Sequence, residues 1–309
     1  MSTSAFRIDW CIFPSPVLNL AIDNYLACLY PYKKPACLSG KIVTDKRPHF
    51  VRFIVYTKEA PVENRETFSV KSDQYARHRP TYPQELFDYL SKQVVVHKRA
   101  WDCATGNGQA AVFCADYFDH VIASDISEQQ IRHAMRHPKI SYCVAAAENT
   151  PFANDSFDMI LVAQAVHWFD RSRFYSECLR LLKPKGILAI VGYGFFEIEP
   201  DIDAVIATHL LTLLDPYWAE GNRMIMAGYK DLSLPVDELH EIPQFSIQLR
   251  WTMSQLLAYL STWSAVKRFI AARGDDPVAR LREHLLPLWQ SAEEEKLVQM
   301  PLFVRVGRV

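Results

Sequence analysis

Short apolar runs alternate with amphipathic stretches through the middle of this chain, regularly from residue 99 to residue 192. The apolar runs predict β-strands over residues 99–103, 121–124, 140–144, 157–163 and 187–192. The stretches between them predict helices over residues 109–117, just after Asp125, and over 174–182. The run 157–163 is continuously apolar after Asp158, which is typical of a strand covered on both faces. Strands and helices alternating at this spacing predict an α/β fold with a doubly wound, mostly parallel sheet.

The pattern changes on both sides of this central region. Before it, residues 84–93 predict a helix that starts after Pro83, whereas residues 1–65 show no clear period. After it, helical patterns cover residues 204–214, 254–270 and 278–289, and strand patterns cover 245–251 and 302–309. We therefore expect four parts: an N-terminal appendage of uncertain structure (1–65), a cap helix segment (66–98), a cofactor-binding core (99–194), and a substrate cover with closing strands of the sheet (195–309).

Composition and charge argue against several classes of protein. Of the 309 residues, 50% are hydrophobic and 22% are charged, which is typical of a globular chain. The net charge of -1 gives no basic excess, so no nucleic-acid partner is expected. The apolar stretch 11–20 contains two prolines and is too short to cross a bilayer, so neither a signal peptide nor a membrane anchor is expected. The 7 cysteines are scattered without a Cys-x-x-Cys pair, which favours a reducing, cytoplasmic location over a disulfide framework or a zinc site.

Two acids and a glycine turn follow neighbouring strands of the predicted sheet. Asp102 lies at the end of the first strand, four residues before Gly106 in a Gly-x-Gly turn completed by Gly108. Asp125 ends the next strand. The carboxyl ends of parallel strands meet at one edge of a sheet, the glycines let backbone approach a ligand closely, and Asp125 can accept from ribose hydroxyls. The sequence therefore predicts a nucleoside-containing cofactor at this edge.

Two cofactors fit such a turn. Gly106, Gly108 and Ala111 match the dinucleotide pattern G-x-G-x-x-G/A, with Asp125 on the ribose, so an NAD-dependent oxidoreductase is one hypothesis. Asp102 instead favours a cofactor that carries an ammonium group, because a carboxylate there would repel the pyrophosphate of NAD but attract an ammonium. Polar motifs also follow the third and fourth strands, at residues 146–152 and 164–170, where a ligand of such a sheet is expected.

Together these motifs carry a family resemblance. The run from Asp102 to Gly192 resembles the class I S-adenosylmethionine-dependent methyltransferases, in the methyltransferase type 11 group that includes ubiquinone and menaquinone methyltransferases. Its elements here are Ala-Glu-x-x-Pro-Phe from Ala147, Gln-Ala-x-His-Trp-Phe-Asp from Gln164 and Leu-Lys-Pro-x-Gly from Leu182. Residues 75–83 and 262–265 resemble the trans-aconitate methyltransferase-like branch, so the resemblance covers about residues 66–309. It implies a Rossmann-like, seven-stranded sheet with a helical substrate cover, and S-adenosyl-L-methionine as cofactor.

The resemblance also implies roles for individual residues around the cofactor. Gly106 and Gly108 would form the turn around its methionine part, with Asp102 near the ammonium and Asp125 on the ribose hydroxyls. The remaining cofactor contacts that it implies are Ala104 at the turn, Ile126 against the adenine, Ala147 and Glu148 along the adenine edge, Gln164 beneath the methionine, and Tyr75 over the methyl-transfer site. Many relatives have an acid where this chain has Ala146, which leaves the adenine amino group without that side-chain contact.

The catalytic candidates follow from the chemistry of methyl transfer. His167 follows the fourth strand, where it can act as a general base or can hold its own loop by a hydrogen bond. Arg77 and Arg79 can pair with a carboxylate through a planar fork. Trp168 can be a packing residue or a platform for the substrate, with packing favoured, and we expect Trp263 to belong to the core.

The predicted partner is a small-molecule methyl acceptor, with O-methylation of a carboxylate as one option. Besides the oxidoreductase, a non-catalytic cofactor-binding member of the fold is an alternative. The sequence does not identify the acceptor, the type of atom methylated, the need for a base, the oligomeric state or the role of residues 1–65.

Overall fold

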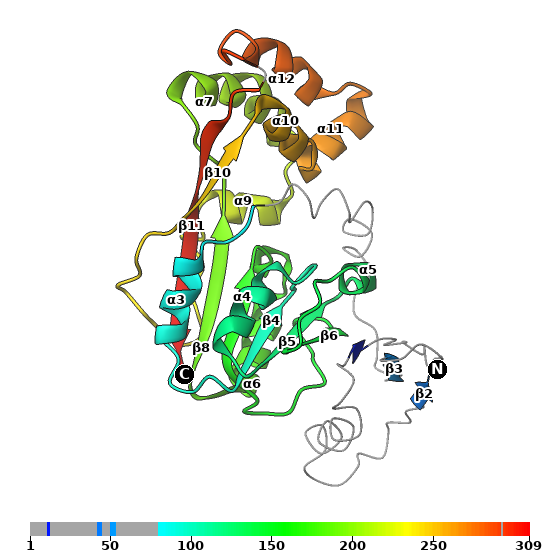
Figure 1. The fold of residues 1–309 in the computed structure, drawn as a ribbon, viewed down its shortest axis with the longest axis vertical. Helices are drawn as coiled ribbons and strands as arrows, with labels where there is room; N and C mark the ends of the chain where they lie inside the picture. Colours follow the sequence, from blue (N-terminus) through cyan, green and yellow to red (C-terminus); the bar gives the residue numbers. More distant parts are fainter. Residues whose placement is uncertain (1–10, 13–41, 45–49, 54–79, 292) are drawn as a thin grey trace.

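The computed structural model describes residues 11–12, 42–44, 50–53, 80–291 and 293–309 (Figure 1). Tyr75, Arg77 and Arg79, three of the predicted site residues, lie outside the described residues. The five predicted strands of the central region form a parallel array, which confirms the predicted fold class. In the order in which they pair, these strands are β6 (Ile140–Val144), β5 (His120–Asp125), β4 (Arg99–Cys103), β7 (Phe157–Ala163) and β8 (Leu182–Tyr193).

Two antiparallel strands extend this array beyond β8. Strand β11 (Lys296–Arg308) pairs with β8 from Leu302 opposite Tyr193 to Arg308 opposite Ile187. Strand β10 (Ser246–Trp251) then pairs with β11 and forms the sheet edge. These seven strands are the predicted sheet. The sheet also gains β1 (Cys11–Ile12), β3 (Phe50–Phe53) and β2 (Ile42–Thr44) beyond β6, and β9 (Asp237–Glu238) beside β11. These additional strands have two to four residues, too short to give a periodic signal in the sequence.

Helices cover both faces of the array, as the continuous burial of β7 requires. They are α3 (Gln84–Lys92), α4 (Gln109–Tyr117), α5 (Glu128–Arg132) and α6 (Arg171–Leu181). The Ser127 side chain accepts from the Gln130 backbone N–H and starts α5, which confirms the helix predicted just after Asp125. Helix α6 begins three residues earlier than predicted, because Asp170 caps it by accepting from the Arg173 N–H.

Strand β8 is longer than its apolar run suggests. It begins at Leu182 rather than at residue 187, because Leu182 pairs with Phe157 of β7 across an irregularity in the register. Residues 183–186 therefore belong to the strand, although they do not continue its hydrophobic pattern.

The chain after β8 builds a helical cover at one end of the sheet, around the tip of the β10–β11 pair (Figure 1). Its main helices are α7 (Pro200–Ile206), α9 (Glu220–Met226), α10 (Met253–Ser261), α11 (Ser264–Arg273) and α12 (Pro277–Leu285). A π-helical turn (Ala207–Leu211), the short helix α8 (Thr212–Leu214) and a 3-10 turn (Asp215–Tyr217) continue α7. Within the described ranges, no helix is long and apolar enough to cross a membrane.

The single helix predicted over residues 254–270 is wrong, because the chain breaks between α10 and α11. Trp263 has an extended backbone (φ -64°, ψ 136°), and the Thr262 hydroxyl donates to the Tyr259 carbonyl at 2.6 Å. The apolar period continues across the break because both helices pack on the same core, so the hydrophobic pattern does not reveal it.

Candidate active site

A cavity of about 400 Å³ lies at the carboxyl ends of β4, β5, β6 and β7, where the sequence predicts a cofactor. We call it the cofactor cavity. Eight of the predicted cofactor-binding residues line it: Asp102, Ala104, Gly106, Asp125, Ile126, Ala147, Glu148 and Gln164. Tyr82, from the segment before α3, also lines it. The ring of Tyr82 lies 6.4 Å from the ring of Tyr193, so this segment reaches the end of β8.

Asp102 is the buried anion of this cavity. Its side chain is 1% exposed, and its Oδ2 accepts a short hydrogen bond from the Thr105 hydroxyl. Burial raises the pKa of Asp102 to about 7, against the lowering effect of the Thr105 bond. Within the described part of the chain, Oδ1 has no hydrogen-bond partner. A buried carboxylate oxygen without a partner is costly, and a cationic ligand group would relieve that cost.

Asp125 holds the glycine turn against the next strand. Its Oδ2 accepts from the Gly106 N–H at 2.9 Å and its Oδ1 accepts from the Ser127 N–H at 2.8 Å. Burial raises the pKa of this carboxyl, and the two backbone hydrogen bonds oppose that shift. Each oxygen still has lone pairs for a ligand hydroxyl, because a carboxylate can accept about four hydrogen bonds.

Gly108 does not line the cavity, although the sequence predicts it in the turn around the cofactor. It has φ +89° at the start of α4, and a Cβ added there would overlap the hydroxyl of Tyr142. That hydroxyl donates to the Met135 carbonyl at 2.6 Å. Gly108 thus lets β6 and α4 approach closely, while Ala104 (φ +56°) and Gly106 (φ +59°) present backbone to the cavity.

The opposite wall comes from the loops after β5 and β6. Ile126 is 43% exposed beside the cavity, an apolar surface on which a ring can pack. Ala146 forms an isolated bridge with Asn149, which places Ala147 and Glu148 at the wall. The Glu148 carboxylate accepts from the Asp170 N–H at 3.1 Å and so joins this loop to the start of α6.

A second cavity of about 410 Å³, the acceptor cavity, adjoins the first. Gln164, Trp168 and Tyr193 line both. The Gln164 amide is fixed there, because Nε2 donates to the Tyr193 carbonyl at 3.0 Å and Oε1 accepts from the Tyr193 N–H at 3.1 Å. Its backbone has φ +57°, an uncommon conformation for a residue with a side chain. Two cavities that meet at a fixed amide suit a reaction between two ligands.

His167 lines the acceptor cavity and bonds a buried tyrosine. The His167 Nδ1 and the Tyr229 hydroxyl lie 3.0 Å apart, and Tyr229 is fully buried. Burial raises the pKa of Tyr229, so its hydroxyl stays neutral. The ring of His167 is thereby fixed in orientation by a residue from the turn after α9. This hydrogen bond joins His167 to a distant segment rather than to the backbone of its own loop, and the place of His167 in the cavity wall suits the predicted role facing a substrate.

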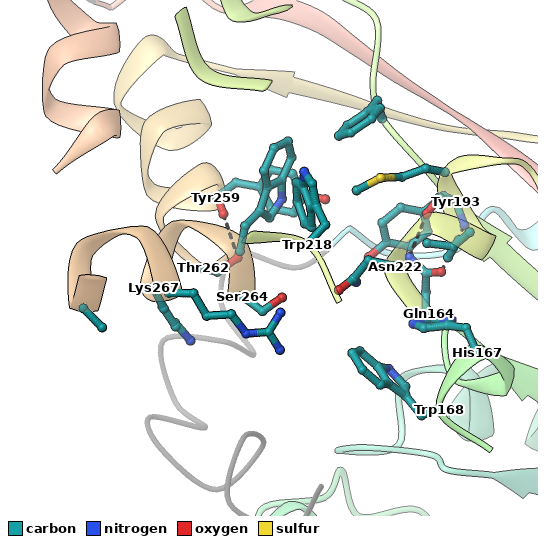
Figure 2. A pocket seen from close by; sticks show the side chains of 17 residues that line it. Gln164, His167, Trp168, Tyr193, Trp218, Asn222, Tyr259, Thr262, Ser264 and Lys267 are labelled. Carbon is teal, nitrogen blue, oxygen red and sulfur yellow. Dashed lines mark hydrogen bonds between the residues drawn. The ribbon is translucent and has the colours of Figure 1, made fainter. Parts of the chain in front are cut away.

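The structure also places residues that the sequence did not suggest. Trp168 and Trp263, expected to be packing residues, both line the acceptor cavity. Trp218, Asn222, Lys267 and Arg268 line it as well, although they match no motif. Figure 2 shows Tyr259, Thr262, Ser264 and Lys267 on the helical side, and Gln164, His167, Trp168 and Tyr193 on the side of the sheet. No local signal could have found Trp218, Asn222, Lys267 and Arg268, because the cover meets the sheet only in the folded chain.

The fold and the comparisons with known proteins define the class of this protein. The family described as "Methyltransferase domain" matches residues 101–190. A Dictyostelium discoideum protein named as a methyltransferase is 32% identical over 245 residues, covering 78% of this chain and 93% of the relative. The chain therefore belongs to the class I S-adenosylmethionine-dependent methyltransferases, rather than to the oxidoreductases.

A solved structure agrees over nearly the same length. A type II methyltransferase from Anaeromyxobacter dehalogenans is 39% identical, with a TM-score of 0.70 over 74% of this chain and 97% of that one. A methyltransferase of Mycobacterium tuberculosis, named as uncharacterized, is 33% identical over 120 residues, which are 38% of this chain and 48% of that protein. The match to the full length of the first two relatives includes the helical cover as well as the sheet.

Proposed function

We propose that this protein transfers a methyl group from S-adenosyl-L-methionine to a small molecule bound in the acceptor cavity. The observation that carries the proposal is the meeting of two cavities at Gln164, Trp168 and Tyr193. When bound, the cofactor supplies a methyl group on a sulfonium, and transfer is a displacement in line with the breaking bond. The protein must therefore mainly align two ligands and exclude water.

The residues of the cofactor cavity support this cofactor. We assign Asp102 to the ammonium, because its Oδ1 is a buried acceptor with no partner within the described ranges. We assign Asp125 to the ribose hydroxyls, Ile126 to the adenine ring, and Ala104 and Gly106 to the methionine part. Ala147 and Glu148 would follow the adenine edge, and Tyr82, which also lines the cavity, would help to close it.

Two of the four parts proposed for the chain correspond to the two cavities. Apart from Tyr82, the described residues that line the cofactor cavity fall within 99–194. The acceptor cavity takes its other wall from residues 195–309, which we propose as the substrate cover. We also propose a location in the cytoplasm, from the scattered cysteines, and a closer kinship with the trans-aconitate methyltransferase-like branch, from residues 75–83 and 262–265.

Calorimetric titration with S-adenosylhomocysteine and, separately, with NAD tests the cofactor. We expect the purified protein to bind S-adenosylhomocysteine and not NAD. Asp125→Ala should weaken the binding of S-adenosylhomocysteine by about 10- to 100-fold, since a hydrogen bond to a charged group contributes about 1.5–3 kcal/mol. Asp116→Ala, at an exposed position on α4, is the matched control and should bind like the parent. Binding of NAD alone would overturn the proposal.

His167 is proposed as the group that takes a proton from the acceptor. Its second ring nitrogen can do so in the tautomer in which the Nδ1 N–H donates to the Tyr229 hydroxyl. Tyr229→Phe removes that hydroxyl and should lower kcat about tenfold while affecting KM little, because it disturbs only the orientation of the base. His167→Ala should lower kcat by about 100-fold or more. Unchanged turnover by His167→Ala between pH 6 and 9 would mean that the acceptor needs no base, as expected for a carboxylate.

A further inference from the structure

Among the described residues, the Lys and Arg side chains that line the acceptor cavity come from one helix. Among the described residues that line this cavity, the only Lys and Arg side chains are Lys267 and Arg268, and there is no Asp or Glu. Both cations are on α11. Arg268 is oriented by a hydrogen bond of 3.0 Å from Nη1 to the Tyr217 carbonyl, which leaves its other nitrogens as donors. Such a lining favours an anionic group on the ligand and disfavours a cationic one.

The rest of the cavity wall is largely aromatic. The Trp263 ring is the centre of this wall, at 5.5 Å from Trp218, 5.8 Å from Phe195 and 5.9 Å from Tyr259 between ring centroids. Ile225 and Met226 add apolar surface. A compact aliphatic polyanion would lose water against these rings without recovering hydrogen bonds. A flat, unsaturated body would instead pack on them.

The cations and the methyl-transfer point lie on opposite sides of the cavity. Figure 2 shows Lys267 on the helical side, whereas Gln164 and His167 project from the side of the sheet, with Asn222 close to Gln164. Gln164 marks the junction with the cofactor cavity. An anionic group held by α11 is therefore kept away from the methyl group, and a different atom of the same molecule reaches it.

We infer that the acceptor is an aromatic hydroxy acid whose carboxylate binds Lys267 and Arg268 and whose hydroxyl receives the methyl group. The inference rests on the proposed function. The hydroxyl oxygen forms the new O–CH₃ bond while the S–CH₃ bond breaks, and the electron pair of the broken bond remains on sulfur. The hydroxyl proton goes to the imidazole of His167. The products are an aryl methyl ether that keeps its free carboxylate, S-adenosylhomocysteine and one proton.

Matched acceptors test the inference. Hydroxybenzoates, hydroxycinnamates and hydroxyindole acetates are offered with S-adenosylmethionine, each beside its primary amide and its analogue without the hydroxyl, and citrate represents a compact polyanion. We expect at least one hydroxy acid to give a base-stable methyl ether, identified by mass spectrometry and NMR. The kcat/KM of its amide should be lower by about tenfold or more, and the analogue without the hydroxyl should not react.

Two variants test whether Lys267 and Arg268 bind the carboxylate of the acceptor. Lys267→Gln and Arg268→Gln should each lower kcat/KM for the hydroxy acid by about tenfold and leave that of the amide nearly unchanged. Arg273→Gln is the matched control on the same helix, because Arg273 bonds the Tyr217 hydroxyl at 3.0 Å and does not line the cavity. A base-labile methyl ester as product, preference for the amide or for citrate, or an equal loss for acid and amide in both variants would overturn the inference.

The cofactor titration separates this inference from the proposed function. If S-adenosylhomocysteine binds but no hydroxy acid of the panel is methylated, the acceptor class is wrong and the cofactor assignment stands. If S-adenosylhomocysteine does not bind, the proposed function itself fails.

Discussion

Asp102→Asn is expected to weaken S-adenosylhomocysteine binding by about 10- to 100-fold at pH 8 and at the same time to stabilise the folded protein. The loss of affinity follows from the loss of a buried negative charge that would face the ligand ammonium. The gain in stability follows from the same burial. A pKa raised from 3.8 to about 7 corresponds to an unfavourable contribution of roughly 4 kcal/mol at high pH. We expect to recover about 1–3 kcal/mol of it, because Asn still buries a polar amide.

The effect of Asp102 on folding stability depends on pH. Below about pH 4, Asp102 is protonated in both the folded and the unfolded chain, so it imposes no penalty on the fold. As the pH rises toward 7, the unfolded chain ionises first, and the contribution of Asp102 to folding stability is progressively lost. The stability advantage of Asp102→Asn should therefore grow from pH 4 to pH 7 and then level off. Denaturant titrations across this range measure it.

Cofactor affinity should follow the opposite course in the parent protein. The ligand ammonium needs the ionised carboxylate, so affinity should rise with pH up to about 7 and then level off, with proton release on binding below that pH. Calorimetry in buffers of different ionisation enthalpy measures that release. Asp116→Asn, on the exposed face of α4, should retain the parent behaviour. If Asp102→Asn bound S-adenosylhomocysteine like the parent, Asp102 would have no role at the ammonium.

Gly108→Ala should destabilise the fold by about 3 kcal/mol or more and abolish cofactor binding indirectly. Two costs add at this position. A side chain at φ +89° is unfavourable by about 1–2 kcal/mol, and the new Cβ would overlap the Tyr142 hydroxyl. Displacement of Tyr142 would also disturb its bond to Met135 and the start of α4, next to the cofactor cavity.

A second glycine separates the two costs. Gly274 also has a left-handed backbone (φ +69°), but a Cβ added there meets nothing within 4 Å. Gly274→Ala should therefore cost only about 1–2 kcal/mol. Adding Tyr142→Phe to Gly108→Ala should restore part of the stability, since it removes the overlapping oxygen. Equal unfolding free energies for Gly108→Ala and Gly274→Ala would show that the approach to Tyr142 is not what requires a glycine at position 108.

Much of the cofactor site could be predicted because it depends on neighbours along the chain. Asp102 and Asp125 lie at the ends of β4 and β5, and Gly106 is in the turn after β4, so parallel pairing of the two strands brings all three to one edge of the sheet. The limits appear where contacts between distant segments decide. Gly108 belongs to the same motif, yet its requirement for glycine comes from Tyr142 on another strand.

The acceptor cavity depends on contacts between distant segments, which the sequence could not predict. Trp263 packs against the core, as expected, but the break between α10 and α11 also places it in the cavity wall. Lys267 and Arg268 match no motif in the sequence. They acquire a possible ligand only because α11 packs across the cavity from Gln164.

The sequence by itself determined the alternating sheet, the family resemblance and the acids and glycine that edge the cofactor cavity. These features rest on backbone periodicity and on spacing along the chain, which are local properties. Only the tertiary structure decided that two cavities meet at Gln164, that Tyr229 orients His167, and that Lys267 lies across the cavity from Gln164 and His167. Those features arise because side chains many residues apart become neighbours when the cover packs on the sheet, and no local pattern encodes such contacts.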